Sequence, residues 1–332
     1  MSKVSKRGAI FMAVATAAAL TLSACGGSVN NAASASSSTA AKDCGSWSAA
    51  LNPWVGYTAD AAVVDYVATT YLGCTINEKN LDEQTSWQGF ESGTVDVIYE
   101  NWGHPDLAKK YITDSKVAQD VGSNGNQGVI GYFVPPWLAA AHPDITDYKN
   151  LNKYASLFVD AESKGKGDWI EGDPSYVTNG KALVKNLNLN FNVRFLGSEQ
   201  ALIEAFKTAE ANKKAVIGYF YEPQWFLSEV PLVKVNFPAY TDGCDADPAK
   251  VACDYPPYPL NKVASVKLMT SGSPFASLVQ NFKWTNDDQN AVAKDIAETK
   301  MAPADAAKKW VNANLDAVNQ WLAGTGVTAT AK

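Results

Sequence analysis

The chain has few of the reactive side chains that most enzymes use. Its 332 residues include only two histidines, His104 and His142, and each precedes a proline in a predicted loop. The sequence contains no G-x-S-x-G, H-E-x-x-H or G-x-x-x-x-G-K-[ST] motif, so the usual signatures of serine hydrolases, zinc proteases and P-loop NTPases are missing. The carboxylates are mostly scattered among lysines on predicted helices, which is typical of a solvated face. We therefore expect neither an enzyme nor a bound cofactor.

Basic residues are also in short supply. Lysine and arginine total 28 against 34 acidic residues, which gives a formal net charge of −6. An acidic chain without a basic stripe argues against nucleic acid as a partner.

A long apolar run occurs only near the N-terminus, where residues 9–22 follow a basic start containing Lys3, Lys6 and Arg7. The run is shorter than the roughly 20 residues that a membrane span needs, and it ends in Leu22-Ser23-Ala24-Cys25. That ending has the pattern at which bacterial lipoproteins are cleaved and acylated. We predict a signal peptide over residues 1–24 and lipidation of Cys25; the alternative is an ordinary secretory signal with a chance cysteine.

The next segment contains almost no large side chain. Gly, Ser, Ala, Asn and Thr dominate residues 26–42, and such a composition is typical of a flexible tether. We predict a tether over residues 25–43 that holds the body at the outer face of the bacterial cell membrane.

Cysteine is scarce as well. Apart from Cys25 there are four, Cys44, Cys74, Cys244 and Cys253, and an even number in an exported protein suggests disulfides with three possible pairings. Cys44 precedes the first predicted strand and Cys74 opens the second, and in a parallel sheet these two strand starts lie at the same edge. Cys244 and Cys253 flank a short turn-rich insert. A four-thiolate metal site is the rival interpretation, but no C-x-x-C spacing supports it, and we expect no metal.

The remaining length of about 290 residues exceeds what one core usually serves, so we expect two lobes. Apolar strand patterns alternate with helical ones, which favours βαβ units and a mainly parallel sheet. Lobe I is predicted over residues 44–128 and 238–332, and lobe II over residues 129–237. The expected strands are residues 46–52, 74–80, 94–100, 128–134, 193–196 and 215–220. The expected helices are residues 59–72 (capped by Thr58), 86–92, 183–189 and 199–212, and most of 287–322, where Trp310 and Trp321 are expected to pack.

Aromatic residues are plentiful instead, with ten Trp and fourteen Tyr. Three aromatic loops follow predicted strands or open a helix, at residues 100–105, 172–178 and 219–225. In open α/β sheets, ligands bind outside the carboxyl ends of the strands, so these loops are expected to meet at one crevice. Several aromatic faces together suit a quaternary ammonium ion, which is bound by cation–π attraction. A carboxylate on such a ligand would suit backbone N–H groups at the start of a helix.

At these loops the sequence resembles the substrate-binding proteins of ABC importers for glycine betaine and proline betaine. The resemblance spans residues 46–322 and lies in the order of the segments Val97-Ile98-Tyr99-Glu100-Asn101-Trp102, Gly172-Asp173-Pro174-Ser175-Tyr176 and Tyr219-Phe220-Tyr221-Glu222-Pro223-Gln224-Trp225. It implies a type II periplasmic-binding fold, in which two α/β lobes with mixed, mainly parallel sheets are joined by crossing hinge strands. It also implies a role in osmoprotection, a membrane permease and its ATPase as partners, and a monomeric receptor.

Carried over residue by residue, the resemblance implies an aromatic box of Trp102, Tyr176 and Tyr221. The chain departs from the three-tryptophan box at both tyrosines, whose faces attract cations less strongly. Backbone N–H groups of Val177 and Thr178 are expected to hold a carboxylate, with His104 assisting. The remaining ligand-binding candidates are Trp54 and Tyr57, as a fourth wall, and Glu100 and Glu222, which would favour a cation such as choline if they faced the cleft and otherwise point away from it.

The predicted function is therefore that of an extracytoplasmic lipoprotein that binds glycine betaine or a related compound (choline, proline betaine or carnitine) for import. The alternative is a lipid-anchored enzyme, sensor or adhesion module that uses the same fold without transport.

Overall fold

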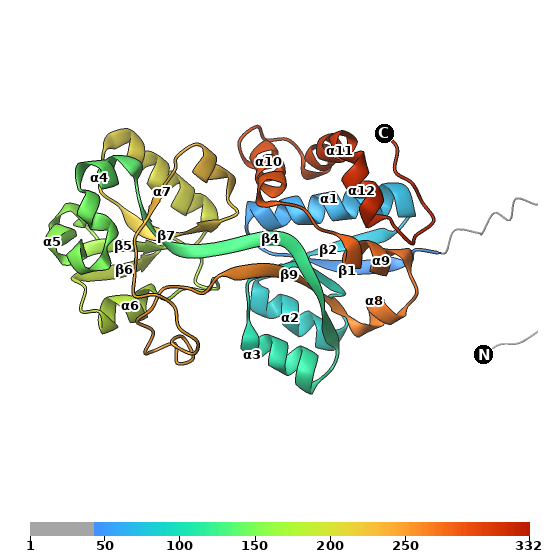
Figure 1. The fold of residues 1–332 in the computed structure, drawn as a ribbon, viewed down its shortest axis with the longest axis horizontal. Helices are drawn as coiled ribbons and strands as arrows, with labels where there is room; N and C mark the ends of the chain where they lie inside the picture. Colours follow the sequence, from blue (N-terminus) through green and yellow to red (C-terminus); the bar gives the residue numbers. More distant parts are fainter. Residues whose placement is uncertain (1–42) are drawn as a thin grey trace, which may run out of the picture. The chain divides into compact units, whose positions relative to one another are not determined.

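A mixed β-sheet runs through residues 43–332, the part of the chain that the computed structural model describes (Figure 1). The predicted signal peptide, the lipidation site Cys25 and all but the last residue of the predicted tether lie outside the described residues. The strands follow the order β2-β1-β3-β9-β4-β7-β5-β6, with β8 paired to β4. Their bounds are β1 Ser46–Leu51, β2 Thr75–Asn80, β3 Val97–Asn101, β4 Ala118–Val134, β5 Gly167–Glu171, β6 Phe191–Phe195, β7 Ile217–Glu222, β8 Val233–Lys234 and β9 Tyr258–Ser265.

Strand β4 joins the two halves of this sheet. Its residues 118–128 pair antiparallel with β9, and its residues 129–133 pair antiparallel with β7. We call the half built on β1, β2, β3 and β9 the first lobe, and the half built on β5, β6, β7 and β8 the second lobe. The predicted two-lobed α/β fold is confirmed. The predicted lobe boundary at residue 129 coincides with the point where β4 changes partner, but the boundaries themselves stay a prediction.

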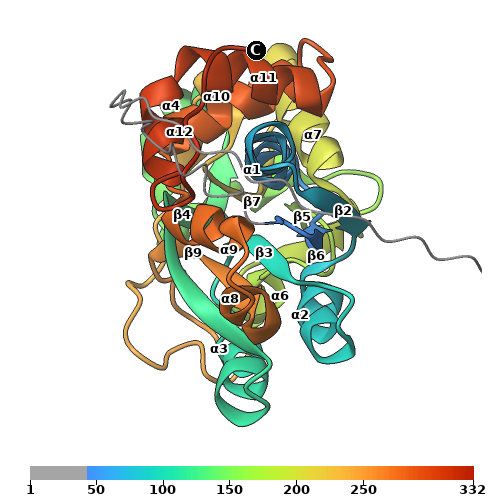
Figure 2. The same cartoon turned by 90° about the vertical axis from the view of Figure 1, so that its right-hand side faces the viewer.

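Helices cover both faces of each half. In the first lobe α1 packs against α9, α10 and α11 on one face, and α2 and α3 lie on the other, as both views show (Figures 1 and 2). The bounds are α1 Val55–Leu72, α2 Glu83–Ser92, α3 Pro105–Ala108, α4 Pro136–Ala141, α5 Leu151–Tyr154, α6 Gly180–Asn186, α7 Glu199–Asn212, α8 Val266–Thr270, α9 Pro274–Asn281, α10 Asn286–Ala297, α11 Pro303–Ala313 and α12 Leu315–Trp321.

Helix α7 illustrates how local sequence sets these bounds. The Ser198 hydroxyl caps the first turn by accepting the Ala201 N–H at 3.2 Å, and the buried residues Leu202, Ile203, Phe206 and Ala209 recur at helical spacing. Because both the cap and the apolar stripe are local, the sequence-predicted range matches the observed one.

Helix α1 differs from its predicted start. It begins at Val55 rather than after Thr58, and no side chain of its own segment caps it. The Val55 N–H instead donates to the Glu199 carboxylate at 2.9 Å. The start of α1 therefore depends on a residue 144 positions away, which the local pattern could not show.

The C-terminal helices close the core of the first lobe. Trp310 and Trp321 are 8% and 3% exposed, and their rings stack at a centroid distance of 5.4 Å. The packing role predicted for both tryptophans is confirmed.

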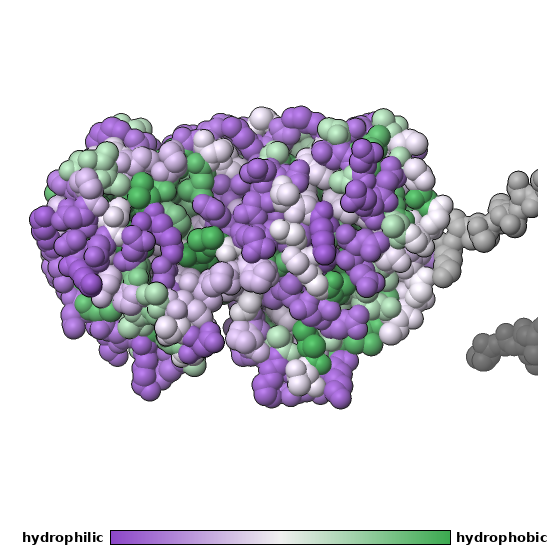
Figure 3. All heavy atoms as spheres, in the orientation of Figure 1, coloured by the Kyte–Doolittle hydropathy of each residue, from purple (hydrophilic) through white to green (hydrophobic). Residues whose placement is uncertain are grey.

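The face drawn in Figure 3 is mostly hydrophilic and is hollowed at its lower edge. A cleft is lined by residues 174–179 of the second lobe, by Asp82 and residues 103–106 of the first lobe, and by Asp245 and Pro248. Within residues 43–332 no helix combines the length and apolar character that a bilayer crossing requires.

Two disulfides join the four cysteines of the described region. Cys44 pairs with Cys74 at the starts of β1 and β2, and Cys244 pairs with Cys253 across the insert before β9. Both pairs agree with the positions that the sequence made plausible. Within residues 43–332, no three His, Cys, Asp or Glu side chains gather closely enough to hold a metal ion.

The two bonds should differ in how much they stabilise the fold. They span 30 and 9 residues, and chain-entropy arithmetic gives about 3.6 and about 2.6 kcal/mol. Replacing Cys44 and Cys74 by alanine should therefore lower the free energy of unfolding more than replacing Cys244 and Cys253, as measured by urea denaturation. Equal losses would show that the bonds do not act through loop length.

Candidate functional site

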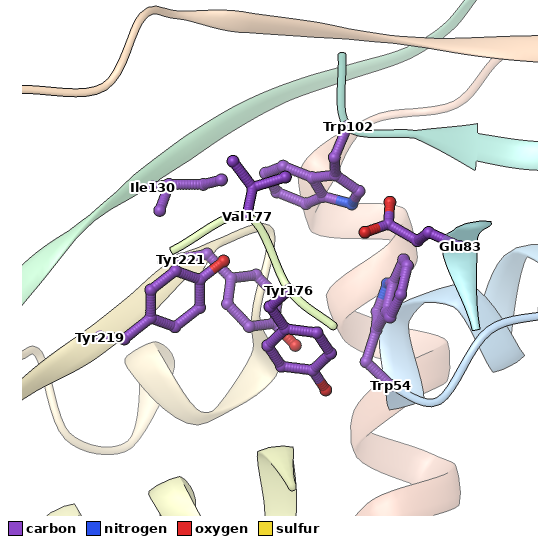
Figure 4. Close-up of a pocket in the computed structure, with 8 residues that line it drawn as sticks. All are labelled: Trp54, Glu83, Trp102, Ile130, Tyr176, Val177, Tyr219 and Tyr221. Carbon is purple, nitrogen blue, oxygen red and sulfur yellow. The ribbon is translucent and has the colours of Figure 1, made fainter. Parts of the chain in front are cut away.

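Five aromatic rings surround a small cavity between the two lobes. Figure 4 shows the rings together with the Glu83 carboxylate, which points toward the space between Trp54 and Trp102. The lining residues are Trp54, Glu83, Trp102, Ile130, Tyr176, Val177, Tyr219 and Tyr221.

The lining residues come from element ends on both lobes. Trp54 precedes α1, Glu83 opens α2 and Trp102 follows β3 in the first lobe. Tyr219 and Tyr221 lie two positions apart on β7, so they share one face of the strand, and Tyr176 belongs to the turn after β5. Each of the three predicted aromatic loops therefore contributes at least one ring to this cavity.

Aromatic pairs bring the lobes together at this cavity. Trp54 and Tyr176 meet edge to face at 6.0 Å, and Trp102 and Tyr221 at 5.6 Å. Both distances and the near-perpendicular planes suit the quadrupoles of the rings. Each pair joins a tryptophan of the first lobe to a tyrosine of the second.

A buried carboxylate holds both tryptophans. The indole N–H groups of Trp54 and Trp102 donate to the same oxygen of Glu100, at 2.8 and 2.7 Å. Glu100 is 1% exposed and does not line the cavity. The two ring planes are thus oriented by one acceptor behind them.

The one carboxylate on the cavity wall has a histidine partner. His104 Nε2 lies 3.0 Å from Glu83 Oε1. Burial opposes protonation of His104, but the hydrogen bond and the charge of Glu83 outweigh burial and raise the pKa of the imidazole above its usual value. His104 therefore pairs with the Glu83 carboxylate and lies in the cleft outside the cavity.

A second buried carboxylate connects a cavity tyrosine to the opposite lobe. Glu199 accepts hydrogen bonds from the Tyr221 hydroxyl and the Gln224 amide of its own lobe, and from the Val55 N–H of the first lobe. The Tyr176 hydroxyl adds a bond to the Pro53 carbonyl at 3.2 Å. Contacts that shape the cavity thus also hold the lobes in this arrangement.

The turn that carries Tyr176 and Val177 is tied down at its far end. The Asn179 N–H donates to the hydroxyl of Tyr255 at 2.7 Å, and the Tyr132 hydroxyl donates to Glu171 Oε1 at 3.0 Å.

Within residues 43–332, the backbone N–H groups of Val177 and Thr178 have no hydrogen-bond acceptor. Two donors in the turn are therefore free for a ligand.

Residues 49–313 match the family described as the substrate-binding domain of ABC-type glycine betaine transport systems. The chain belongs to this family. The family expected from the three aromatic loops is thereby confirmed, and it is a family of transport binding domains.

Individual relatives are similar but distant. A trimethylamine N-oxide-binding protein of Pelagibacter ubique (strain HTCC1062) is 26% identical over 256 residues, which cover 73% of this chain and 80% of that protein. An ABC-transporter choline-binding protein in complex with choline superposes with a TM-score of 0.68 at 17% identity, covering 87% of this chain and 94% of the other. A lactococcal protein of the family, in its closed conformation with glycine betaine, gives 0.65 at 20% identity, with coverages of 83% and 99%. Both structures show the same two-lobed fold.

Not every residue expected at the site of this binding domain reaches the cavity. Trp54, Trp102, Tyr176, Val177 and Tyr221 line it. The others lie elsewhere: Tyr57 is fully buried against Trp54, Thr178 and His104 line the outer cleft, Glu100 is buried behind the tryptophans, and Glu222 is exposed.

Three lining residues were absent from the sequence-based set: Glu83, Ile130 and Tyr219. Tyr219 could have been found, because it lies two positions before Tyr221 in a predicted strand. Glu83 and Ile130 carry no local signal, since a helix-opening glutamate and a strand isoleucine are common in any α/β protein.

The Glu171 carboxyl should make stability depend on pH. Its burial raises its pKa from 4.5 to about 8, so between these values the folded state keeps a proton that the unfolded state releases. Stability from this group is therefore present below pH 4.5 and lost as pH rises toward 8. Relative to Glu171→Gln, the free energy of unfolding of the wild type should fall by at most about 1.4 kcal/mol per pH unit across this window.

Urea denaturation of both proteins at pH 5, 6.5 and 8 measures this difference. Other buried carboxyls are shared by the two proteins and cancel in the comparison. A stability difference that stays constant with pH would contradict the assignment.

The Glu199 carboxylate should protect the Val55 amide from hydrogen exchange. Val55 N–H is in the first turn of α1 and has no acceptor within the helix, so Glu199 alone protects it. Glu199→Gln removes the charge from this bond, and exchange at Val55 should accelerate about tenfold, since charged bonds contribute roughly 1.5–3 kcal/mol. Glu204→Gln, at an exposed position of the same helix, is the control, and equal rates in the two variants would refute the link.

Proposed function

We propose that this protein is the extracytoplasmic receptor of an ABC importer and that it binds a small trimethylammonium compound in the cavity between its lobes. A lipid on Cys25 would hold the monomeric receptor at the outer face of the membrane. The ligand-filled, closed form would then deliver its cargo to a permease driven by an ATPase. The family supports the transport role, and the sequence of residues 1–43 supports the anchor.

The observation that carries this proposal is the convergence of five aromatic rings on one small cavity. A quaternary ammonium has no N–H donor and spreads its charge over methyl groups, so aromatic faces are suited to bind it. Each face contributes roughly 0.5–2 kcal/mol. Several faces together reach the approximately −8 kcal/mol of a micromolar complex.

The Glu83 carboxylate favours a ligand without a carboxylate of its own. The residues that line the cavity include one acid and no lysine or arginine, so an added negative charge would meet repulsion there. Choline fits this pattern, because its hydroxyl can donate to Glu83 while the rings hold its cationic end. We therefore propose choline as the preferred ligand.

Glycine betaine is the second candidate, on a different observation. The free N–H groups of Val177 and Thr178 are placed to donate to its carboxylate, as donors at a turn do for other anions. In that case the carboxylate would have to lie on the far side of the cavity from Glu83. Trimethylamine N-oxide, the ligand named for the Pelagibacter relative, is smaller and carries only an oxygen.

Calorimetric titration of the purified protein with choline, glycine betaine and trimethylamine N-oxide tests the proposal. We expect micromolar binding of choline. In Trp102→Ala the affinity for choline should fall about 10- to 100-fold, because one desolvated cation–π contact contributes roughly 2 kcal/mol. Trp137→Ala, a half-buried tryptophan of α4 outside the cavity, is the matched control.

The variant Glu83→Gln separates the two candidates. If choline is the ligand, this variant should bind it more weakly and bind glycine betaine more tightly than the wild type does. Binding of none of the three compounds by a folded sample would refute the proposed function. Conversion of a bound compound into a product would instead favour an enzyme that uses this fold.

A further inference from the structure

Glu100 is a charged residue in a strand that is buried along its whole length. All five residues of β3 are buried, and Glu100 itself is 1% exposed. Burying a carboxylate is costly unless hydrogen bonds compensate it. Packing alone therefore does not explain a glutamate at this position.

The hydrogen bonds around Glu100 all come from N–H donors. One oxygen accepts both cavity indoles at 2.8 and 2.7 Å, and the other accepts the Gln289 amide at 2.9 Å. Gln289 is oriented in turn by the Asn126 amide. Three N–H donors stabilise the ionised form of a carboxyl group.

A second buried carboxyl group, that of Asp60, lies near Glu100. Asp60 is fully buried, and within residues 43–332 its oxygens have no hydrogen-bond partner. Burial, and then the charge of Glu100, raise the pKa of Asp60 well above its usual value. The nearby ammonium of Lys262 donates to the carbonyls of Gln280 and Phe282 rather than to either acid.

The negative charge of Glu100 thus stands directly behind two walls of the cavity. A bond from an indole N–H to a carboxylate is charge-assisted and polarises the donor, which makes both π faces of the ring more negative. The charge also acts on a cation across a medium of low dielectric constant. Both effects act on a cationic ligand and not on a neutral one.

We propose that Glu100 is a positioning and specificity residue, which fixes the planes of Trp54 and Trp102 and gives the cavity its preference for cations over neutral molecules of the same shape. The preference rests on the proposed function, whereas the positioning of the two rings does not. Glu100 acts through the indoles and makes no contact with the ligand.

The test compares choline with 3,3-dimethyl-1-butanol, in which a carbon replaces the charged nitrogen. The variants are Glu100→Gln, which keeps an acceptor oxygen but removes the charge, and Glu100→Leu, which removes both. Glu83→Gln, at the cavity wall, is the control for a direct contact. The readouts are the Kd values of both compounds and the ¹H–¹⁵N signals of the indole N–H groups.

Glu100→Gln should weaken choline binding by about tenfold or more, as expected for loss of a charge-assisted interaction, and should change binding of the neutral analogue by less than about threefold. The indole signals of Trp54 and Trp102 should shift in Glu100→Gln and shift further in Glu100→Leu, and should stay in place in Glu204→Gln, at an exposed position of α7. Equal losses for both compounds would overturn the specificity role, and unmoved indole signals would overturn the positioning role.

Failure of the proposed function gives a different result. In that case the wild type binds neither compound, and the proposed preference for cations is refuted together with the proposed function. The indole signals still decide whether Glu100 positions the two tryptophans.

Discussion

The antiparallel pairing of β4 is the constraint on which the site depends. One strand pairs with β9 in the first lobe and then with β7 in the second, so the two lobes share a continuous backbone ladder. At the change of partner stands Gly128, where a Cβ atom would lie 2.7 Å from the Trp102 ring. The absence of a side chain there lets that ring pack directly against the joining strand.

Three buried acidic residues near this ladder each hold a different part of the cavity wall by hydrogen bonds. Glu100 orients the two tryptophans of the first lobe, and Glu199 links Tyr221 to the first turn of α1. Glu171 supports the tyrosines that hold the end of the Tyr176 turn. Because each acid is buried, each must be hydrogen-bonded or protonated, and that requirement ties the position of the cavity walls to the packing behind them.

The cavity combines an apolar wall with a small number of charges. Five rings line the cavity together with the Glu83 carboxylate, whose His104 partner lies outside the cavity. Such a lining offers aromatic faces and few hydrogen-bonding groups, and the chain belongs to a family of substrate-binding domains of glycine betaine transport systems.

The fold class, the family, the positions of the cysteines that pair, and most of the rings at the cavity could be predicted from the amino-acid sequence. These are carried by local patterns: strand–helix alternation, the caps and apolar stripe of α7, and aromatic residues at strand ends. Four features became visible in the folded chain alone: α1 starts at Val55, Glu83 and Ile130 reach the cavity, Glu100 lies behind the tryptophans, and Glu222 is exposed. Each of these depends on contacts between segments far apart in the chain, such as Val55 with Glu199, and no local pattern encodes which buried donor meets which acceptor.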